Sequence, residues 1–204
     1  MAQRRRRLLD VDTILDGALV VIDRHGRLTM ADLAAQLGTS ASSVYHHVNG
    51  RAAIVELLRE RVVVAALDVP PLDGTDWVDQ LSGWMRSYRR ALAEHPNLIP
   101  LLTEHTMTGG SVLRGYDRIA ALLLQVGVPA REVLLWLSVF DSYALGAALD
   151  LAAPDEVWRG EVEELMALNE AIRAAPRGRR RADEAFEIGL DAMLAGLRLR
   201  LPRS

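Results

Sequence analysis

An all-α fold is predicted for this chain of 204 residues. Apolar residues recur three and four positions apart through nearly every long segment, which is the period of an amphipathic helix. No stretch of the sequence alternates between apolar and polar residues over a useful strand length. Half of the residues are hydrophobic, so the helices can bury a sizeable core.

The first two predicted helices have clear start and stop residues. An apolar stripe with helical spacing covers residues 14–22, and Gly26 follows it as the end of the helix. A second, short helix begins at Thr29, which forms a shortened capping box with Asp32, and it continues to Leu37.

The third and fourth predicted helices follow directly. A glycine ends the second helix, and Ser40 is placed to cap a third helix whose buried side would carry Val44 and Val48. After a turn at residues 49–50, apolar positions between 53 and 62 predict a fourth helix. The short second and third helices, joined by a tight connection, form a helix-turn-helix arrangement.

A break at residues 68–74, which contain two prolines, marks a predicted boundary between two modules. A domain of residues 1–68 would precede a larger helical domain of residues 69–204. In the second domain, helices are predicted from Trp77 to near Pro96 and at about 111–126, 130–152, 155–174 and 182–201, with an exposed loop at 175–181.

Composition points to a cytoplasmic protein. The sequence has no cysteine, and its start lacks the apolar core of a signal peptide. Residues 133–153 are apolar enough to suggest a membrane span, but they include Asp141 and Asp150. An aspartate near the centre of a bilayer costs about 2.5–3.5 kcal/mol. We therefore expect a helix that is buried in protein, and no membrane partner.

The third predicted helix and the turn after it are rich in small or flat hydrogen-bonding residues. In a helix-turn-helix, the second helix of the pair enters the DNA major groove by its N-terminal end. Ala41, Ser42 and Ser43 would let the backbone approach the base edges, while Tyr45 and His47 would bind phosphates. The predicted DNA-contacting set is Thr29, Ser40, Ala41, Ser42, Ser43, Tyr45, His46, His47 and Arg51.

Residues 25–58 resemble the tetracycline-repressor (TetR) family of transcriptional regulators. They read HGRLTMADLAAQLGTSASSVYHHVNGRAAIVELL. By this resemblance, Tyr45 and His47 are the phosphate-contacting pair, and residues 41–43 occupy the base-reading end. Arg51 stands where the family usually has lysine, and Val48 stands where it often has an aromatic residue. The resemblance implies a homodimer that binds a double-stranded DNA operator, a repressor released by a small-molecule effector, and no cofactor.

Two helices of the second domain are suited to dimerisation. The predicted helix at 130–152 is apolar nearly all round, so every face of it needs cover. The last helix is apolar over more than one stripe. These two helices from each of two chains would form a four-helix interface. The small residues that would let another helix approach closely are Ala144, Gly146, Ala147 and Ala148.

An effector pocket would need apolar walls with a few polar groups. Asp141 lies on an otherwise apolar helix, and a buried carboxylate must be paired, hydrogen-bonded or protonated. Two interpretations of Asp141 stay open: a structural pair with Arg114 or Arg118, and an anchor for a polar or cationic effector. For each aromatic residue, core packing is the alternative. The candidate pocket residues are Trp84, Tyr88, His105, Met107, Tyr116, Trp136, Phe140, Asp141 and Tyr143.

Other functions are less well supported by the sequence. An enzyme is disfavoured because a glycine-rich phosphate loop, HExxH and G-x-S-x-G are all absent. No metal site is expected at His46 and His47, since neighbouring side chains on a helix point about 100° apart. The alternative to a regulator is a helical interaction module whose helix-turn-helix does not bind DNA. Arg4–Arg7 would be either a solvated tail or an arm on the DNA.

Overall fold

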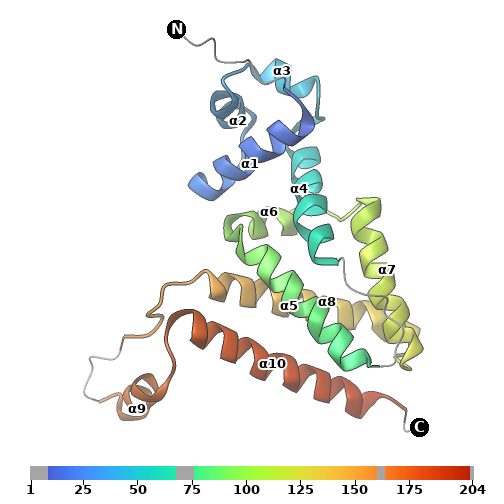
Figure 1. Ribbon diagram of the computed structural model, residues 1–204, viewed down its shortest axis with the longest axis vertical. Helices are drawn as coiled ribbons and strands as arrows, with labels where there is room; N and C mark the ends of the chain where they lie inside the picture. The colour runs from blue at the N-terminus through green and yellow to red at the C-terminus, as the bar shows by residue number, and fades with distance from the viewer. Residues whose placement is uncertain (1–8, 68–75, 160–163, 203–204) are drawn as a thin grey trace. The chain divides into compact units, whose positions relative to one another are not determined.

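In the computed structural model, the regular elements of the described residues are all helices (Figure 1). This confirms the all-α prediction. The described residues are 9–67, 76–159 and 164–202. The predicted module boundary at 68–74 therefore lies outside them. The chain divides into two compact units, a first unit of residues 1–65 and 95–115 and a second unit of residues 66–94 and 116–204.

The first unit opens with four helices, and the N-caps at Thr29 and Ser40 were predicted from the sequence. The helices are α1 (Val11–His25), α2 (Met30–Leu37), α3 (Ala41–Tyr45) and α4 (Gly50–Leu67). The side chains of Asp10, Thr29 and Ser40 each accept a hydrogen bond from a backbone N–H three residues later, and so cap the first three helices. Gly38 ends α2 with a φ of 62°, a left-handed conformation that glycine adopts without steric cost.

α3 is shorter than the sequence predicts. It ends at Tyr45, and the chain turns through residues 46–49 before α4 begins. Gly50, the first residue of α4, has a φ of 85°, a left-handed conformation that glycine adopts without steric cost. Val48 lies beyond the helix but is still buried, and its N–H donates to the carbonyl of Val44 at 3.1 Å.

Two short elements of the first unit were missed by the sequence analysis. They are the 3₁₀ helix η1 (Pro96–Leu98) and α6 (Ile99–Thr103). Proline breaks the interior of a helix, but here each proline stands in a first turn, where it is tolerated. Buried Leu98, Ile99 and Leu102 anchor both elements in the first unit.

The second unit is built around a long central helix. Its helices are α5 (Trp77–Ala93), the later part of α7 (Gly110–Gln125), α8 (Ala130–Leu151), α9 (Met166–Ala174) and α10 (Gly178–Arg200). α5 and α10 each pack along α8 (Figure 1). Trp84, Phe140 and Leu190 come from these three helices and are completely buried, so the core of the unit lies where the helices meet.

The helix predicted over 155–174 is only partly formed. Residues 155–159 are not helical, residues 160–163 lie outside the described part of the chain, and α9 begins at Met166. None of the residues of α9 is buried. Its apolar spacing predicted the helix type correctly over residues 166–174.

The exposed loop predicted for residues 175–181 is wrong in its second half, because α10 already begins at Gly178. Gly178 has a φ of 54°, and its N–H donates to the carbonyl of Asp155 at 3.1 Å. This tie to the segment after α8 fixes where α10 starts. The glycine and the arginines near it were interpreted as loop signals from the sequence.

α8 has the length and apolar composition of a membrane span, and no other helix in the described ranges does. Within the chain, however, one side of it is covered by α5 and α10, and Phe140, Ala144 and Ala148 on that side are completely buried. Only 28% of its most apolar window is buried within the chain. Core helices pass the same test of composition, so α8 by itself does not indicate a membrane.

Candidate nucleic-acid interface

The predicted DNA-contacting residues all lie in the first unit, on α3 or close to it in the sequence. Thr29 is half-buried before α2, where its Oγ1 accepts from the Asp32 N–H at 3.0 Å and donates to Asp32 Oδ2 at 2.7 Å. Ala41 is half-buried at the start of α3. The position of Thr29 is therefore set by its capping role.

Two of the three serines around α3 are used by the fold itself. Ser40 Oγ accepts the Ser43 N–H at 3.2 Å, and the two hydroxyl oxygens lie 2.9 Å apart. Ser42 is exposed, and its hydroxyl makes no hydrogen bond to the described residues. Ser42 is thus the serine whose hydroxyl is free to meet a base edge, a distinction that the sequence alone did not give.

Tyr45, His46 and His47 form an exposed group at the end of α3 and on the turn after it. Tyr45 is 53% exposed, whereas its neighbour Val44 is completely buried. Val44 and Val48 anchor the turn from inside, so the three polar side chains face outward. The described residues contain no group of three or more His, Cys, Asp or Glu side chains that could hold a metal ion.

Arg51 already has an anionic partner in this structure. Its Nη2 lies 2.6 Å from Oε2 of Glu104, the residue that follows α6. The side chains of Arg51 and Glu104 are 37% and 46% exposed, so the ion pair lies at the surface of the first unit. The two residues are 53 positions apart in the sequence, and no local pattern could have predicted the pair.

α4 is also tied to residues 102–111, which we call the strap, by buried polar contacts. Arg59 is 6% exposed, and its Nη2 donates to the carbonyls of Leu102 at 2.7 Å and of His105 at 3.2 Å. Its Nε lies 3.1 Å from Glu56 Oε2 in an ion pair. Because a buried guanidinium needs such partners, these contacts fix the strap against α4.

Carboxylates of α4 hold the far end of the strap. Glu56 Oε1 accepts the N–H of Thr108 at 3.0 Å and that of Gly109 at 2.6 Å. Glu60 accepts a hydrogen bond from the hydroxyl of Ser111. A Cβ at position 109 would lie 2.9 Å from Glu56 Oε1, so the absence of a side chain at Gly109 permits this close approach.

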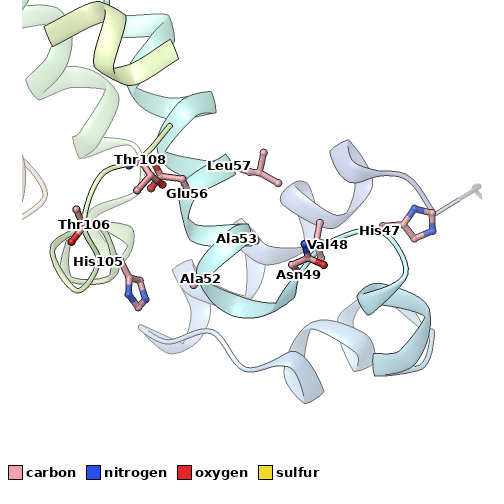
Figure 2. A pocket seen from close by; sticks show the side chains of 10 residues that line it. All are labelled: His47, Val48, Asn49, Ala52, Ala53, Glu56, Leu57, His105, Thr106 and Thr108. Carbon is pink, nitrogen blue, oxygen red and sulfur yellow. Dashed lines mark hydrogen bonds between the residues drawn. The ribbon is translucent and has the colours of Figure 1, made fainter. Parts of the chain in front are cut away.

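An open groove lies between the first half of α4 and the strap (Figure 2). Its volume is about 550 Å³. His105, a predicted pocket residue, lines it from the strap, and Met107 is half-buried on the same segment. The lining residues are His47, Val48, Asn49, Ala52, Ala53, Glu56, Leu57, His105, Thr106 and Thr108.

Five of the predicted pocket residues come together in the second unit. Trp84 stacks on Tyr88 with 5.5 Å between ring centroids, and Phe140 meets Trp84 edge-on at 6.4 Å. Tyr116 donates to Asp141 Oδ1 at 2.7 Å, and the hydroxyl oxygens of Tyr88 and Tyr116 lie 3.4 Å apart. Asp141 is therefore hydrogen-bonded to a tyrosine, a partner that the sequence analysis did not name.

The polar atoms of this cluster are held in a low-dielectric setting. Burial raises the pKa of Tyr116 far above its usual range, so the phenol stays neutral and donates to the carboxylate of Asp141. The Trp84 Nε1–H is buried and finds no acceptor among the described residues. A buried indole N–H usually donates a hydrogen bond, and this one has no acceptor among the described residues.

Trp136 and Tyr143 lie at the edges of the cluster. The Trp136 ring is 5.8 Å from that of Phe140, so it belongs to the same aromatic group. Tyr143 faces α10 instead: it stacks on Phe186 at 5.5 Å and donates to the Phe186 carbonyl at 2.8 Å. It also packs against Gly189, so α10 of the same chain approaches α8 closely at this point.

A buried arginine of α5 was missed by the sequence analysis. Arg89 is 4% exposed, and its Nη1 donates to Asp183 Oδ1 at 2.7 Å. Its guanidinium also lies 4.5 Å above the ring of Phe186. These contacts join α5 to α10, so Arg89 has a structural role in the second unit. α5 also carries Arg86 and Arg90, and nothing in the sequence marks Arg89 as the buried one of the three.

α8 and α10 both leave apolar residues uncovered. Leu135 of α8 is 64% exposed and Ile188 of α10 is 72% exposed. Beside exposed charged residues such as Arg131 and Asp191, each helix carries one row of exposed positions at helical spacing whose residues are mostly apolar or small. They are Leu135, Val139, Ser142, Gly146 and Leu149 on α8, and Ile188, Ala192, Ala195 and Leu199 on α10. Ala144 and Ala148 face the core of the chain instead.

The sequence was compared with protein families and curated proteins. Residues 70–201 match the family described as "Tetracyclin repressor-like, C-terminal domain". An HTH-type transcriptional regulator of Saccharopolyspora erythraea is 29% identical over 175 residues, which cover 84% of this chain and 72% of that protein. The HTH-type transcriptional repressor DrrR1 of Streptomyces coeruleorubidus is 25% identical over 165 residues, or 80% of this chain and 59% of DrrR1. This chain thus spans less than two thirds of the length of DrrR1.

Solved structures share the fold. ActR of Streptomyces coelicolor, in complex with actinorhodin, has a TM-score of 0.76 and 22% sequence identity, with coverage of 97% of this chain and 99% of ActR. The helical arrangement is therefore common to the two proteins.

Proposed function

Since this chain belongs to the tetracycline-repressor (TetR) family of transcriptional regulators, we propose that it is a cytoplasmic repressor that binds a double-stranded DNA operator as a homodimer and releases it on binding a small-molecule effector. The observation that carries the proposal is the exposed polar group on and after α3, supported from inside by buried valines. The names of the curated relatives, a transcriptional regulator and a transcriptional repressor, support the same function.

The N-terminal end of α3 would enter the major groove. Ala41 and Ser42 would face the base edges, with Ser42 able to donate or accept a hydrogen bond and Ala41 able to touch a thymine methyl group. Tyr45 and His47 would bind phosphates on either side and fix the register of α3. Ser40 and Ser43 would act mainly through the cap that holds α3 in shape.

The homodimer would form through α8 and α10. Their exposed apolar residues form one stripe on each helix, and two copies of each helix would bury all four stripes in one bundle. An interface of this kind is symmetric, so it would present two copies of α3 to the DNA. Helix-turn-helix dimers place their reading helices about 34–36 Å apart, or a multiple of this distance.

The effector would bind beside the aromatic cluster of the second unit. Trp84 offers a buried N–H without an acceptor, and the carboxylate of Asp141 accepts from Tyr116 at one oxygen. A flat aromatic molecule that carries a hydrogen-bond acceptor would stack on these rings and satisfy the indole N–H. This pocket would comprise Trp84, Tyr88, Tyr116, Trp136, Phe140 and Asp141.

Fluorescence anisotropy with labelled DNA from the region flanking the gene tests the proposal. The Tyr45→Ala, His47→Ala double variant should lose on the order of a hundredfold or more in affinity, because each lost phosphate hydrogen bond costs about 1 kcal/mol and a dimer carries two sets. Trp158→Ala is the matched control, since Trp158 is also 53% exposed but lies in the second unit. Equal binding by all three proteins would remove Tyr45 and His47 from the interface, and failure of the unmodified chain to bind any DNA at low salt would favour the interaction-module alternative.

A further inference from the structure

We propose that Glu104 competes with DNA for Arg51. In the free protein the carboxylate of Glu104 pairs with the Arg51 guanidinium, and in the DNA-bound state a phosphate takes its place. This inference rests on the proposed function, because it needs Arg51 to contact the DNA backbone. It adds a residue outside the helix-turn-helix that lowers the affinity for every DNA sequence alike.

Arg51 lies where an anion is attracted. It is the second residue of α4, and the first turn of a helix presents unpaired backbone N–H groups and the positive end of the helix dipole. The guanidinium of Arg51 adds a full positive charge at the same end. In this structure Glu104 supplies the anion, with 2.6 Å between Oε2 and Nη2. A carboxylate and a phosphate present similar oxygens to a guanidinium.

Glu104 is held at this position by the strap. Arg59 donates to the carbonyls of Leu102 and His105, so it binds the backbone on both sides of Glu104. Arg51 and Arg59 are eight residues apart on α4, about 12 Å along its axis. One helix therefore carries both the arginine that fixes the strap and the arginine that Glu104 neutralises.

Residues 108–109 add a second attachment on the other side of Glu104. The carboxylate of Glu56 accepts the backbone N–H of Thr108 and of Gly109. Because these contacts are made by backbone atoms and a buried arginine, the strap cannot swing away as a free surface side chain would. The pair between Glu104 and Arg51 differs in this respect from an ordinary surface ion pair, whose two partners both move freely.

A phosphate that binds Arg51 would displace the carboxylate and remain close to its charge. The phosphate must first break the ion pair between Arg51 and Glu104, and loss of one exposed ion pair changes an equilibrium constant by about threefold. A dimer would carry this penalty at both reading heads, which gives about tenfold in operator affinity. The effect should shrink at high salt, because both charges are exposed.

The test uses the full-length chain and two labelled duplexes, one from the flanking DNA of the gene and one of random sequence. Glu104→Gln removes the charge and keeps the size of the side chain. Glu187→Gln is the matched control, since Glu187 forms an equally short surface pair with Arg86, at 2.6 Å with 45% and 42% exposure, in the second unit. Arg51→Gln and the Arg51→Gln, Glu104→Gln double variant complete the cycle, and thermal unfolding checks that each variant is folded.

The expected result is that Glu104→Gln binds both duplexes about tenfold more tightly at low salt, while Glu187→Gln binds as the unmodified chain does. In the Arg51→Gln background, most of the gain from Glu104→Gln should disappear, because the ion pair that a phosphate has to break is then absent. An unchanged affinity for Glu104→Gln, or an equal gain in the Arg51→Gln background, would overturn the inference and leave the proposed function standing. Failure of the unmodified chain and of Glu104→Gln to bind either duplex would overturn both.

Discussion

Replacement of Arg59 by methionine should destabilise the first unit strongly. The guanidinium is 6% exposed, makes two hydrogen bonds to the carbonyls of Leu102 and His105, and pairs with Glu56. Methionine keeps much of the apolar stem but leaves both carbonyls without this donor and Glu56 without its cation. Charge-assisted hydrogen bonds contribute about 1.5–3 kcal/mol each, and breaking a buried ion pair costs about 3–5 kcal/mol. Because Glu56 is 20% exposed and the His105 contact is only partly buried, water can solvate part of what the substitution frees. We therefore expect a loss at the low end of these values, about 3 kcal/mol.

Thermal unfolding followed by circular dichroism measures this loss. For a chain of this size, 1 kcal/mol corresponds to about 2–4 °C, so Arg59→Met should lower Tm by about 6–12 °C. Arg61→Met is the control on the same helix, because Arg61 pairs with Asp16 at the surface with 42% and 51% exposure. That pair should contribute less than about 1 kcal/mol. Equal Tm values for the two variants would refute the view that Arg59 fixes the strap.

Three further predictions concern the dimer, the DNA and pH. Leu135→Glu should yield monomers in sedimentation velocity. Leu124→Glu, at an exposed leucine of α7, should leave the dimer intact. If both variants were dimers, the assignment of α8 and α10 as the dimer interface would be wrong. Ser42→Ala should change the base preference in a binding selection without changing Tm, and an unchanged preference would remove Ser42 from the base-reading set. Arg86 lowers the pKa of Glu187 below its usual 4.5, so the pair stabilises the fold above about pH 4.5 and this contribution is lost as pH falls through the lowered value. Glu187→Gln should therefore cost less than about 1 kcal/mol at pH 7 and progressively less as the pH falls below 4.5; a cost that does not fall with pH would contradict the assignment.

The sequence predicted most where local chemistry determines structure. Thr29 and Ser40 were expected as helix caps from their residue types and spacing, and both accept the capping hydrogen bond. The apolar period placed the core of α1 and α5 correctly because an amphipathic helix buries one stripe. Gly50 was expected in a turn and has a left-handed φ, whereas no sequence signal predicted that α3 ends at Tyr45.

Contacts between distant residues could not be predicted from the sequence. Arg51 was assigned to DNA, and its neighbours in the sequence gave no sign that Glu104 lies 2.6 Å away. Arg59 shows the same limit: its carbonyl partners are 43 and 46 residues away, and backbone carbonyls carry no residue-type signal. For Asp141, charge pairing with an arginine was weighed from composition, and the structure shows a hydrogen bond from Tyr116.

The measurement that tests the central claim most directly is selection of bound DNA from a pool of random duplexes by the full-length chain. Two copies of α3 on one symmetric dimer should enrich a palindromic motif whose half-sites are about 34–36 Å apart, or a multiple of this distance. The Tyr45→Ala, His47→Ala variant should enrich no motif. Recovery of no motif by the unmodified chain, or of the same motif by the variant, would contradict the assignment of α3 and the turn after it as the DNA-reading surface.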